Sequence, residues 1–434
     1  MRVLRANYFG RSARANYWAA TALAAQLRRL LDGANAAFRR HVVRDFKRYW
    51  LASPRPVSGE TRERAEAAVG WLLGAQRVTP DDGVSFGWFP CDGDATAWRP
   101  SYPETTGYII TSLLDYAALF HDREARESAL RMARWEVDTQ MPSGAVQGGP
   151  VCPPDRQTPA AFNTGMVLDG WCSAYRESRD AAVFEAARRA ADFLVSDLDE
   201  NGYFRTNGAF VSSGEIKTYT CLCAWAMHRF ADLSGEPRYA LAAVRAVEAA
   251  IAQQQDNGWF AHNCLARSDA PLTHTIGYTL QGVLEVGVLA RRDDFIAAVV
   301  KTVDRLLPQI SNVGYLPGTF YSDWQPAGFS SCLTGSAQIA IVCYRLATLT
   351  GKPEYRASAD RLVDYLKALQ DVTTDVEGIK GALPGSFPIF GGYMRGGYPN
   401  WATKYLLDAL MLQHISSLAP EASSARNAMT AALA

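Results

Sequence analysis

Ser101-Tyr102-Pro103-Glu104-Thr105-Thr106-Gly107-Tyr108 opens an apolar run that continues to Leu114, and altered copies of this stretch recur along the chain. The clearest copies are Asn163-Thr164-Gly165-Met166, His274-Thr275-Ile276-Gly277-Tyr278 and Leu333-Thr334-Gly335-Ser336. A second match, of residues 233–239 with residues 349–355, fixes the register. The position of Gly107 then recurs at Gly165, Tyr219, Gly277, Gly335 and, in a looser copy, Lys404, in steps of 58, 54, 58, 58 and 69 residues. A near-constant long period with two helices per unit is typical of a repeat architecture.

Two kinds of helical segment alternate after residue 60. One kind is rich in Ala and charged residues, and the sequence predicts it at 61–76, 122–140, 180–198, 237–254, 293–309 and 353–370. The other kind is apolar on nearly all sides, which is typical of a buried helix, and is predicted at 104–120, 163–175, 217–233, 274–289, 334–349 and 401–414. Six outer and six inner helices predict an all-α fold, a closed (α/α)6 toroid. The alternative, an open solenoid, would need polar caps that the sequence does not show.

The ends of the chain differ from this repeat. Residues 1–58 are rich in Arg and Ala and helical in pattern, so we expect an N-terminal helical extension packed on the main body. Residues 59–418 form the expected toroid, and 419–434 a C-terminal tail. The long segments that precede the inner helices are rich in Gly, Pro and aromatic residues. They gather on one face of a toroid, and long loops on one face of a rigid scaffold are where function is expected.

Composition excludes several classes of function. The 44 basic residues balance 44 acidic ones, so the chain lacks the electrostatic footprint of a nucleic-acid-binding protein. No apolar stretch is long enough to span a bilayer. The eight Cys are scattered without paired motifs, and we interpret them as reduced thiols of a cytoplasmic protein. The sequence has no dinucleotide fingerprint, P-loop or zinc spacing, so we expect neither cofactor nor metal.

The chain resembles the six-hairpin glycosidase superfamily, and within it the proteins encoded with bacterial exopolysaccharide and capsule biosynthesis genes. The residues that carry the resemblance are 101–108, 274–278, 331–335, 383–388 and 398–402, and it covers about residues 60–415. It implies a pocket at the inner helices, a sugar or polysaccharide substrate and an association with the polysaccharide synthesis machinery. It leaves the reaction open, because the superfamily includes hydrolases, lyases and epimerases.

Two side chains suited to acid–base chemistry lie three residues before the repeat position. They are Glu104 and His274, three repeats apart, so they face each other across a six-fold ring. Helix axes about 9 Å apart leave roughly 8 Å between two such side chains, which is room for one sugar ring. A carboxyl group buried among tyrosines would have a raised pKa, as the general acid of a glycoside hydrolase needs. The alternative for Glu104 is a carboxylate that caps its helix.

Glycoside hydrolysis also uses a second carboxylate, for which Asp323 is the first candidate and Glu215 the second. Alternatively, both carboxylates form hydrogen bonds that order the loops in which they lie. His274 supports a different reaction, since an epimerase or uronate lyase needs a base that removes a proton next to a carbonyl or carboxylate group. Tyr278 would be the opposing acid, and His262 is a lesser candidate base. The alternative to an enzyme is a non-catalytic protein that binds glycans as a component of exopolysaccharide synthesis.

Other residues are candidates for binding the substrate. Lys217, Lys404 and Arg395 are basic residues near apolar helices, and they would neutralise a uronate or phosphate unless acidic neighbours already pair with them. Aromatic rings can stack on sugar faces or fill the core. The aromatic and amide candidates are Trp88, Trp259, Trp324, Trp401, Tyr102, Tyr108 and Asn163.

Overall fold

The computed structural model describes residues 36–50, 54–91, 97–208, 215–265 and 267–418. Most of the expected N-terminal extension and all of the expected C-terminal tail therefore lie outside the described residues. No helix among the described residues is long and apolar enough to cross a membrane.

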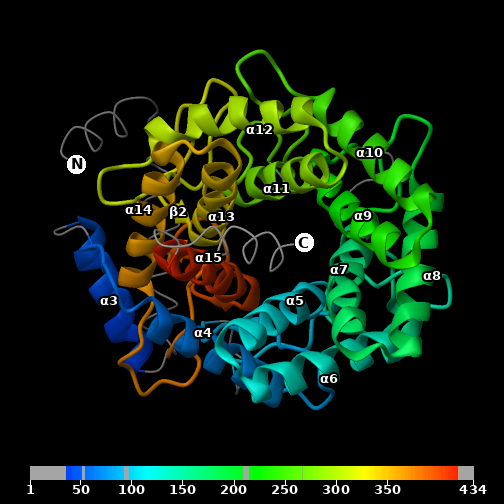
Figure 1. Ribbon diagram of the computed structural model, residues 1–434. Helices are drawn as coiled ribbons and strands as arrows, with labels where there is room; N and C mark the ends of the chain where they lie inside the picture. Colours follow the sequence, from blue (N-terminus) through cyan, green and yellow to red (C-terminus); the bar gives the residue numbers. More distant parts are fainter. Residues whose placement is uncertain (1–35, 51–53, 92–96, 209–214, 266, 419–434) are drawn as a thin grey trace.

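Within residues 61–418, as far as the structure describes them, twelve α-helices alternate between an outer and an inner ring, as the sequence predicts (Figure 1). The outer helices are α4 (Thr61–Arg77), α6 (Arg123–Thr139), α8 (Ala181–Asp197), α10 (Pro237–Ile251), α12 (Asp293–Leu306) and α14 (Pro353–Leu369). The inner helices are α5 (Pro103–Phe120), α7 (Ala161–Ser178), α9 (Leu222–Ser234), α11 (Thr273–Leu289), α13 (Leu333–Thr350) and α15 (Asn400–Leu418). Each inner helix contacts the next, and α15 contacts α5, which closes the ring. The predicted (α/α)6 toroid is confirmed.

The two rings differ in burial for a reason that the sequence shows. The inner helix α11 is buried at every position from Thr273 to Gly287, because outer and inner neighbours surround it. The outer helix α6 buries one stripe, including Ala125, Ala129 and Met132, and its other side carries charge. Such a stripe at helical spacing faces the core and leaves the polar side in water.

The repeat glycines allow neighbouring inner helices to approach closely. A Cβ atom on Gly107 would lie 2.5 Å from the Cα atom of Val167 on α7. One on Gly335 would lie 2.6 Å from the backbone nitrogen of His274 on α11. The preceding threonine adds a second constraint, since the Val84 amide donates to Thr106 Oγ1 at 2.9 Å and fixes the loop to the helix. In α5 the Thr-Gly pair therefore fixes the preceding loop and sets the spacing to α7.

The links between helices are long at one end of the ring and short at the other. The N-terminal ends of the inner helices receive the long links, which contain the 3-10 helices η1 (Pro154–Arg156), η3 (Thr218–Cys221) and η4 (Leu307–Gln309). Short strands join these loops in antiparallel pairs, β1 (Gly87–Trp88) with β4 (Tyr398–Pro399), and β2 (Ser331–Cys332) with β3 (Ser386–Phe387). At the other end only His121 and Asp122 separate α5 from α6.

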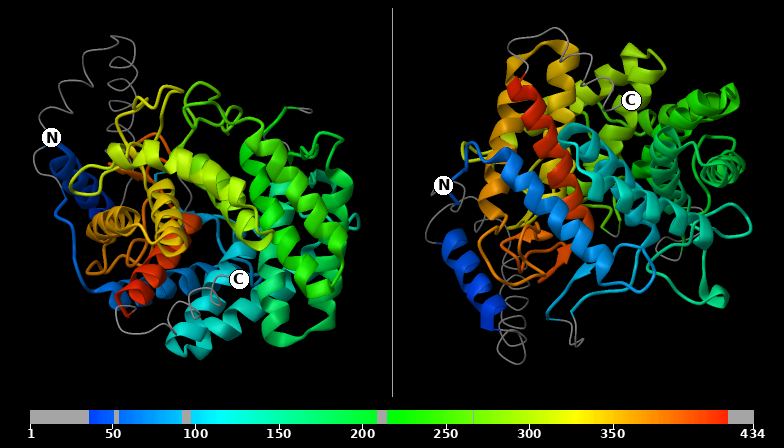
Figure 2. Two further views of the ribbon diagram at one scale, coloured as in Figure 1. Left: turned by 45° about the horizontal axis from the view of Figure 1, so that its top comes forward. Right: turned by 60° about the horizontal axis from the view of Figure 1, so that its bottom comes forward.

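The described part of the N-terminal extension is helix α3 (Ala36–Trp50), which lies beside α14 and the loop that follows it (Figures 1 and 2). Arg44 forms an ion pair with Asp371 at 2.6 Å, and the Tyr398 hydroxyl lies 3.0 Å from His41 Nε2. This part of the extension therefore packs on the toroid.

Candidate active site

Glu104 lies in the first turn of α5, at the loop-rich end of the ring. The Tyr102 hydroxyl donates a hydrogen bond to Glu104 Oε2 at 2.5 Å. Burial raises the pKa of Glu104 to about 7, although the bond from Tyr102 acts in the opposite direction. A carboxyl group with this pKa is substantially protonated at neutral pH, so it can act as a proton donor.

His274 occupies the matching position on α11 and is 4% exposed. Its Nδ1 atom lies 2.8 Å from Oε1 of Gln338 on α13. An amide oxygen only accepts hydrogen bonds, so Nδ1 carries the proton and Nε2 keeps its lone pair. Burial lowers the pKa of His274 to about 4, so the imidazole is neutral at pH 7 and can accept a proton.

Five tyrosines lie around the axis of the ring beside these two residues, and we call them the tyrosine collar. They are Tyr108, Tyr219, Tyr278, Tyr393 and Tyr405. The ring of Tyr278 is 4.3 Å from that of His274 and 6.1 Å from that of Tyr405. Tyr278 therefore extends from α11 to the side chains of α15, past the intervening helix, and fills part of the space expected for a sugar. Burial raises the pKa of Tyr278 well above 10, so its hydroxyl stays protonated.

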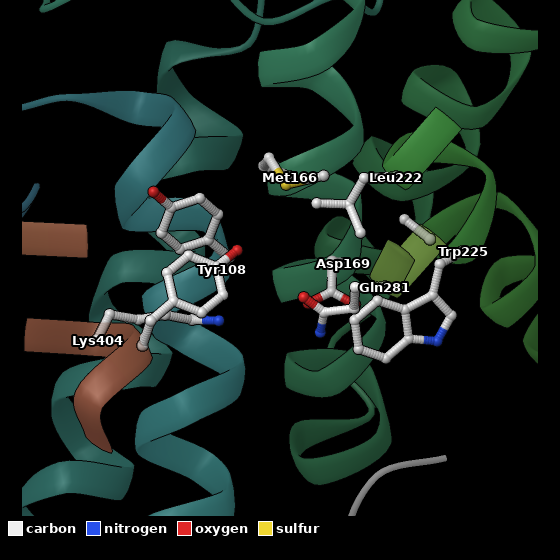
Figure 3. Close-up of a pocket in the computed structure, with 9 residues that line it drawn as sticks. Tyr108, Met166, Asp169, Leu222, Trp225, Gln281 and Lys404 are labelled. Atoms are coloured by element: carbon white, nitrogen blue, oxygen red, sulfur yellow. The ribbon is translucent and has the colours of Figure 1, made fainter. Parts of the chain in front are cut away.

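A cavity lies about one helical turn deeper along the axis (Figure 3). Its empty volume is about 280 Å³, part of which is open to solvent. In Figure 3 the amine of Lys404 points across the cavity toward Asp169 and Gln281. The residues that line it come from five of the six inner helices and are Tyr108, Met166, Asp169, Leu222, Trp225, Ala226, Gln281, Lys404 and Tyr405.

The structure brings several predicted binding residues to this region. Trp401 donates from its indole nitrogen to the Tyr393 hydroxyl at 2.9 Å, and its ring lies 6.2 Å from that of Tyr102. Asn163 is buried and donates to the Gln147 carbonyl at 2.9 Å, close to the Tyr102 hydroxyl. Together with Tyr108 and Lys404, they line or support the space below Glu104.

The other predicted carboxylates lie at the surface. Asp323 is exposed, and its Oδ1 atom accepts from the Gln325 amide at 3.0 Å within the same loop. Glu215 is exposed and forms an ion pair with Lys217 at 2.8 Å. Neither appears among the charges that shift the pKa of Glu104. Both contacts match the loop-ordering alternative.

Several other candidates lie within the loops. Trp88 packs against Phe38 and Tyr398, with ring centroids 6.0 and 5.9 Å away. Trp259 and Trp324 pack on each other at 5.2 Å. The remaining candidates are exposed: Arg395 donates to the Gly391 carbonyl, and the carbonyl of His262 accepts from Thr218.

Several residues of the site were not among the sequence predictions, including Tyr219, Tyr405 and most of the cavity lining, and two of them contact His274 directly. Gln338 is a polar residue on an otherwise apolar inner helix, three positions after Gly335, and that pattern could have indicated it. Tyr393 lies 5.3 Å from the His274 ring but comes from the long link between α14 and α15, where no spacing marks it. The described residues contain no group of three or more His, Cys, Asp or Glu side chains that could hold a metal ion.

No family model and no curated protein matches this chain. Among solved structures, an unsaturated glucuronyl hydrolase specific for heparin superimposes with a TM-score of 0.67 at 14% identity, covering 82% of this chain and 98% of its own. The unsaturated glucuronyl hydrolase of Bacillus sp. GL1 gives 0.64 at 16% identity, covering 81% and 96%. Cellobiose 2-epimerase from Bacillus thermoamylovorans B4167 gives 0.64 at 10% identity, covering 82% and 98%. These enzymes represent the six-hairpin glycosidase superfamily, and at such identities the likeness concerns the fold.

Replacing Gln338 with Leu should remove the acceptor that fixes the proton on Nδ1 of His274. We expect the imidazole to become a mixture of tautomers, with turnover at least tenfold lower, because a misplaced base loses much of its contribution. Nitrogen NMR of the histidine ring measures the tautomer directly. Gln338→Glu is the matched control, since a carboxylate restores the acceptor and should restore the Nδ1–H form. An unchanged tautomer in Gln338→Leu would show that the contact does not orient His274.

Proposed function

We propose that this protein is a carbohydrate-active enzyme, a glycoside hydrolase that acts on an oligosaccharide or polysaccharide at the loop-rich end of the toroid. The observation that carries the proposal is the half-buried carboxyl group of Glu104, whose pKa is raised to about 7, in the same layer as a neutral histidine. The fold shared with saccharide-acting enzymes supports the substrate class.

In this reaction Glu104 donates its proton to the glycosidic oxygen while the bond from that oxygen to the anomeric carbon breaks. A water molecule attacks the anomeric carbon, and Nε2 of His274 accepts its proton. The pKa of about 4 for His274 is close to that of an ordinary carboxylate, so its basicity suits the role that a second carboxylate has in other glycosidases. We therefore assign the base to His274, ahead of Asp323 and Glu215. Exchange with solvent then returns a proton to Glu104 and removes the one that His274 accepted.

A second candidate is an epimerase or uronate lyase, and the pair of His274 and Tyr278 favours it. The neutral imidazole can remove a proton from a carbon next to a carbonyl or carboxylate group, and the protonated Tyr278, 4.3 Å away between ring centroids, can return one. In that reaction Glu104 is not the acid.

The cellular setting is also part of the proposal. A cytoplasmic location and an association with exopolysaccharide synthesis rest on the cysteine pattern and on the resemblance of residues 101–108, 274–278 and the later motifs. A non-catalytic glycan-binding role is the outcome if substitutions at Glu104 and His274 leave every turnover unchanged while sugar binding persists.

The pH dependence of kcat/KM should separate these reactions. The hydrolase needs Glu104 protonated, so activity should fall as pH rises through about 7, and it needs His274 neutral, so activity should fall below about 4. For an epimerase that uses His274 and Tyr278, kcat/KM should still fall below about pH 4, but it should not fall as pH rises through about 7. Circular dichroism over the same range is the control for unfolding. A flat profile between pH 5 and 9 would contradict the acid role of Glu104.

A further inference from the structure

Helix α3 contacts the toroid through a chain of hydrogen bonds that ends on strand β4. Asp371, in the loop after α14, accepts from Arg44 Nη1 at 2.6 Å, and Arg44 Nη2 lies closest to His41 Nδ1, at 2.8 Å. A guanidinium group only donates, so Nδ1 keeps its lone pair and Nε2 carries the proton. Burial and the neighbouring Arg44 lower the pKa of His41 to about 3, so the imidazole is neutral at pH 7. Its Nε2–H group therefore donates to the hydroxyl oxygen of Tyr398 in β4, 3.0 Å away.

Strand β4 leads from this contact to the acid of the site. Asn400 follows the strand directly as the first residue of α15, and it is fully buried. Its side-chain nitrogen donates to Thr105 Oγ1 at 2.7 Å and to the Ser85 carbonyl at 2.8 Å. Thr105 is the neighbour of Glu104 in the first turn of α5. The position of β4 is therefore transmitted to the turn that carries Glu104.

The same strand and helix also reach the base of the site. Trp401 follows Asn400 and donates from its indole nitrogen to the Tyr393 hydroxyl at 2.9 Å, and the ring of Tyr393 lies 5.3 Å from that of His274. Tyr393 belongs to the link between α14 and α15, and α3 packs against the outside of this link, where the rings of Phe46 and Phe390 are 6.3 Å apart. The link that touches His274 is therefore held between α3 and the inner helices.

A packed row of aromatic rings forms a second connection from α3 to the acid. Phe38 of α3 is fully buried, and its ring lies 6.0 Å from that of Trp88 in β1, the strand that pairs with β4. Phe86, two residues before Trp88, lies 5.3 Å from the ring of Tyr102, whose hydroxyl donates to Glu104. Close-packed rings of this kind transmit a displacement because protein interiors contain few voids that could absorb it.

We infer that helix α3 is a positioning element of the active site, and that His41 and Tyr398 are positioning residues through which it holds Glu104 and His274 in one layer. The inference rests on the proposed function and deepens it, because it makes the described part of the N-terminal extension necessary for the alignment of acid and base. A displacement of about 1 Å at the reacting groups is enough to lower a rate by up to about a hundredfold, even when its cause lies far from the chemistry.

Tyr398→Phe in the full chain tests this, since it removes the oxygen that accepts from His41 and keeps the ring. We expect kcat for glycoside hydrolysis to fall about tenfold or more while KM changes less than about threefold. The pKa of Glu104 should fall from about 7 toward its ordinary value, because burial is what raises it and looser packing admits water. Carbon NMR of the labelled carboxyl group measures this pKa, and the signal is assigned by its loss in Glu104→Gln.

The control for a purely structural effect is Tyr355→Phe. Tyr355 on α14 is fully buried like Tyr398, and its hydroxyl donates to Asp304 Oδ1 at 2.8 Å, between two outer helices. Both variants should lower the unfolding midpoint by a similar amount, but only Tyr398→Phe should change kcat and the pKa of Glu104. His41→Leu is the second disruptive variant, and His41→Gln should restore both quantities, because its amide can still donate to Tyr398.

The inference is overturned if Tyr398→Phe and His41→Leu change stability as Tyr355→Phe does but leave kcat and the pKa of Glu104 as in the unaltered chain. In that case the hydrolase proposal still stands, provided that Glu104→Gln abolishes turnover. If instead the pKa of Glu104 falls in both variants and recovers in His41→Gln, while the unaltered chain hydrolyses no glycoside, the positioning role stands and the hydrolase proposal fails.

Discussion

Glu104→Gln should reduce glycoside hydrolysis by about a hundredfold to ten-thousandfold, the range that a positioned general acid contributes. The amide is nearly the same size as the carboxyl group and can still accept from the Tyr102 hydroxyl, so the site should keep its shape. It cannot donate a proton to a leaving oxygen. We therefore expect kcat to fall while the affinity for the sugar changes little, and the limb of the pH profile near 7 to disappear.

The measurement is steady-state hydrolysis of aryl glycosides and of oligosaccharides, with an aryl leaving group as an internal control. A good leaving group needs little proton donation, so the variant should keep more activity on activated aryl glycosides than on oligosaccharides. Glu200→Gln is the matched control, because Glu200 is an exposed carboxylate in the link between α8 and α9. If both variants hydrolyse oligosaccharides at the rate of the unaltered chain, Glu104 is not the acid.

Gly107→Ala should lower the free energy of unfolding by about 3 kcal/mol, within the range for overpacking a close-packed interface. The added Cβ atom would lie 2.5 Å from Val167 Cα and 2.8 Å from Val167 N. Both atoms belong to the backbone of α7, so no side-chain rotation relieves the clash and the two helices must separate. Since α5 also carries Glu104, we expect activity to fall with stability. Urea unfolding followed by circular dichroism measures the change.

Gly70→Ala should have the opposite effect on the free energy of unfolding. Gly70 lies within α4, is exposed, and a Cβ atom there would meet nothing within 4 Å. Alanine loses less conformational entropy in a helix than glycine, so stability should rise by about 0.5–1 kcal/mol. If the two variants shift the unfolding midpoint equally, glycine contacts do not set the spacing of the inner ring.

The sequence predicted the architecture because each repeat has a recognisable local pattern of residues. The Thr-Gly stretch at Gly107 and its copies gives the register, and the contrast between apolar and charged helices assigns each to a ring. Most helices of the structure begin and end close to the predicted positions, but α9 begins at Leu222, after the 3-10 helix η3, and not at the predicted Lys217. The register also identified the opposed positions of Glu104 and His274, because equivalent positions of a repeat share a layer of the toroid.

The surroundings of these two residues could be predicted in part. Trp401 and Tyr102 lie in the site, whereas Trp88 packs on a helix of the N-terminal extension, far away in the sequence. Composition does not separate a tryptophan that covers a loop from one that lines a pocket. The contact of Tyr393 with His274 depends on the path of a long link, and the pairing of Lys404 with Asp408 depends on a rotamer. Such features arise from tertiary packing, which a one-dimensional pattern does not record.

We propose that Glu104 protonates a glycosidic oxygen in the layer that it shares with His274. A crystal structure of Glu104→Gln with a bound oligosaccharide tests this most directly. We predict a glycosidic oxygen within about 3 Å of the substituted amide side chain at position 104, and the anomeric carbon on the side that faces His274. A sugar bound on the outer loops, with the side chain at position 104 in contact with Tyr102 alone, would contradict the claim.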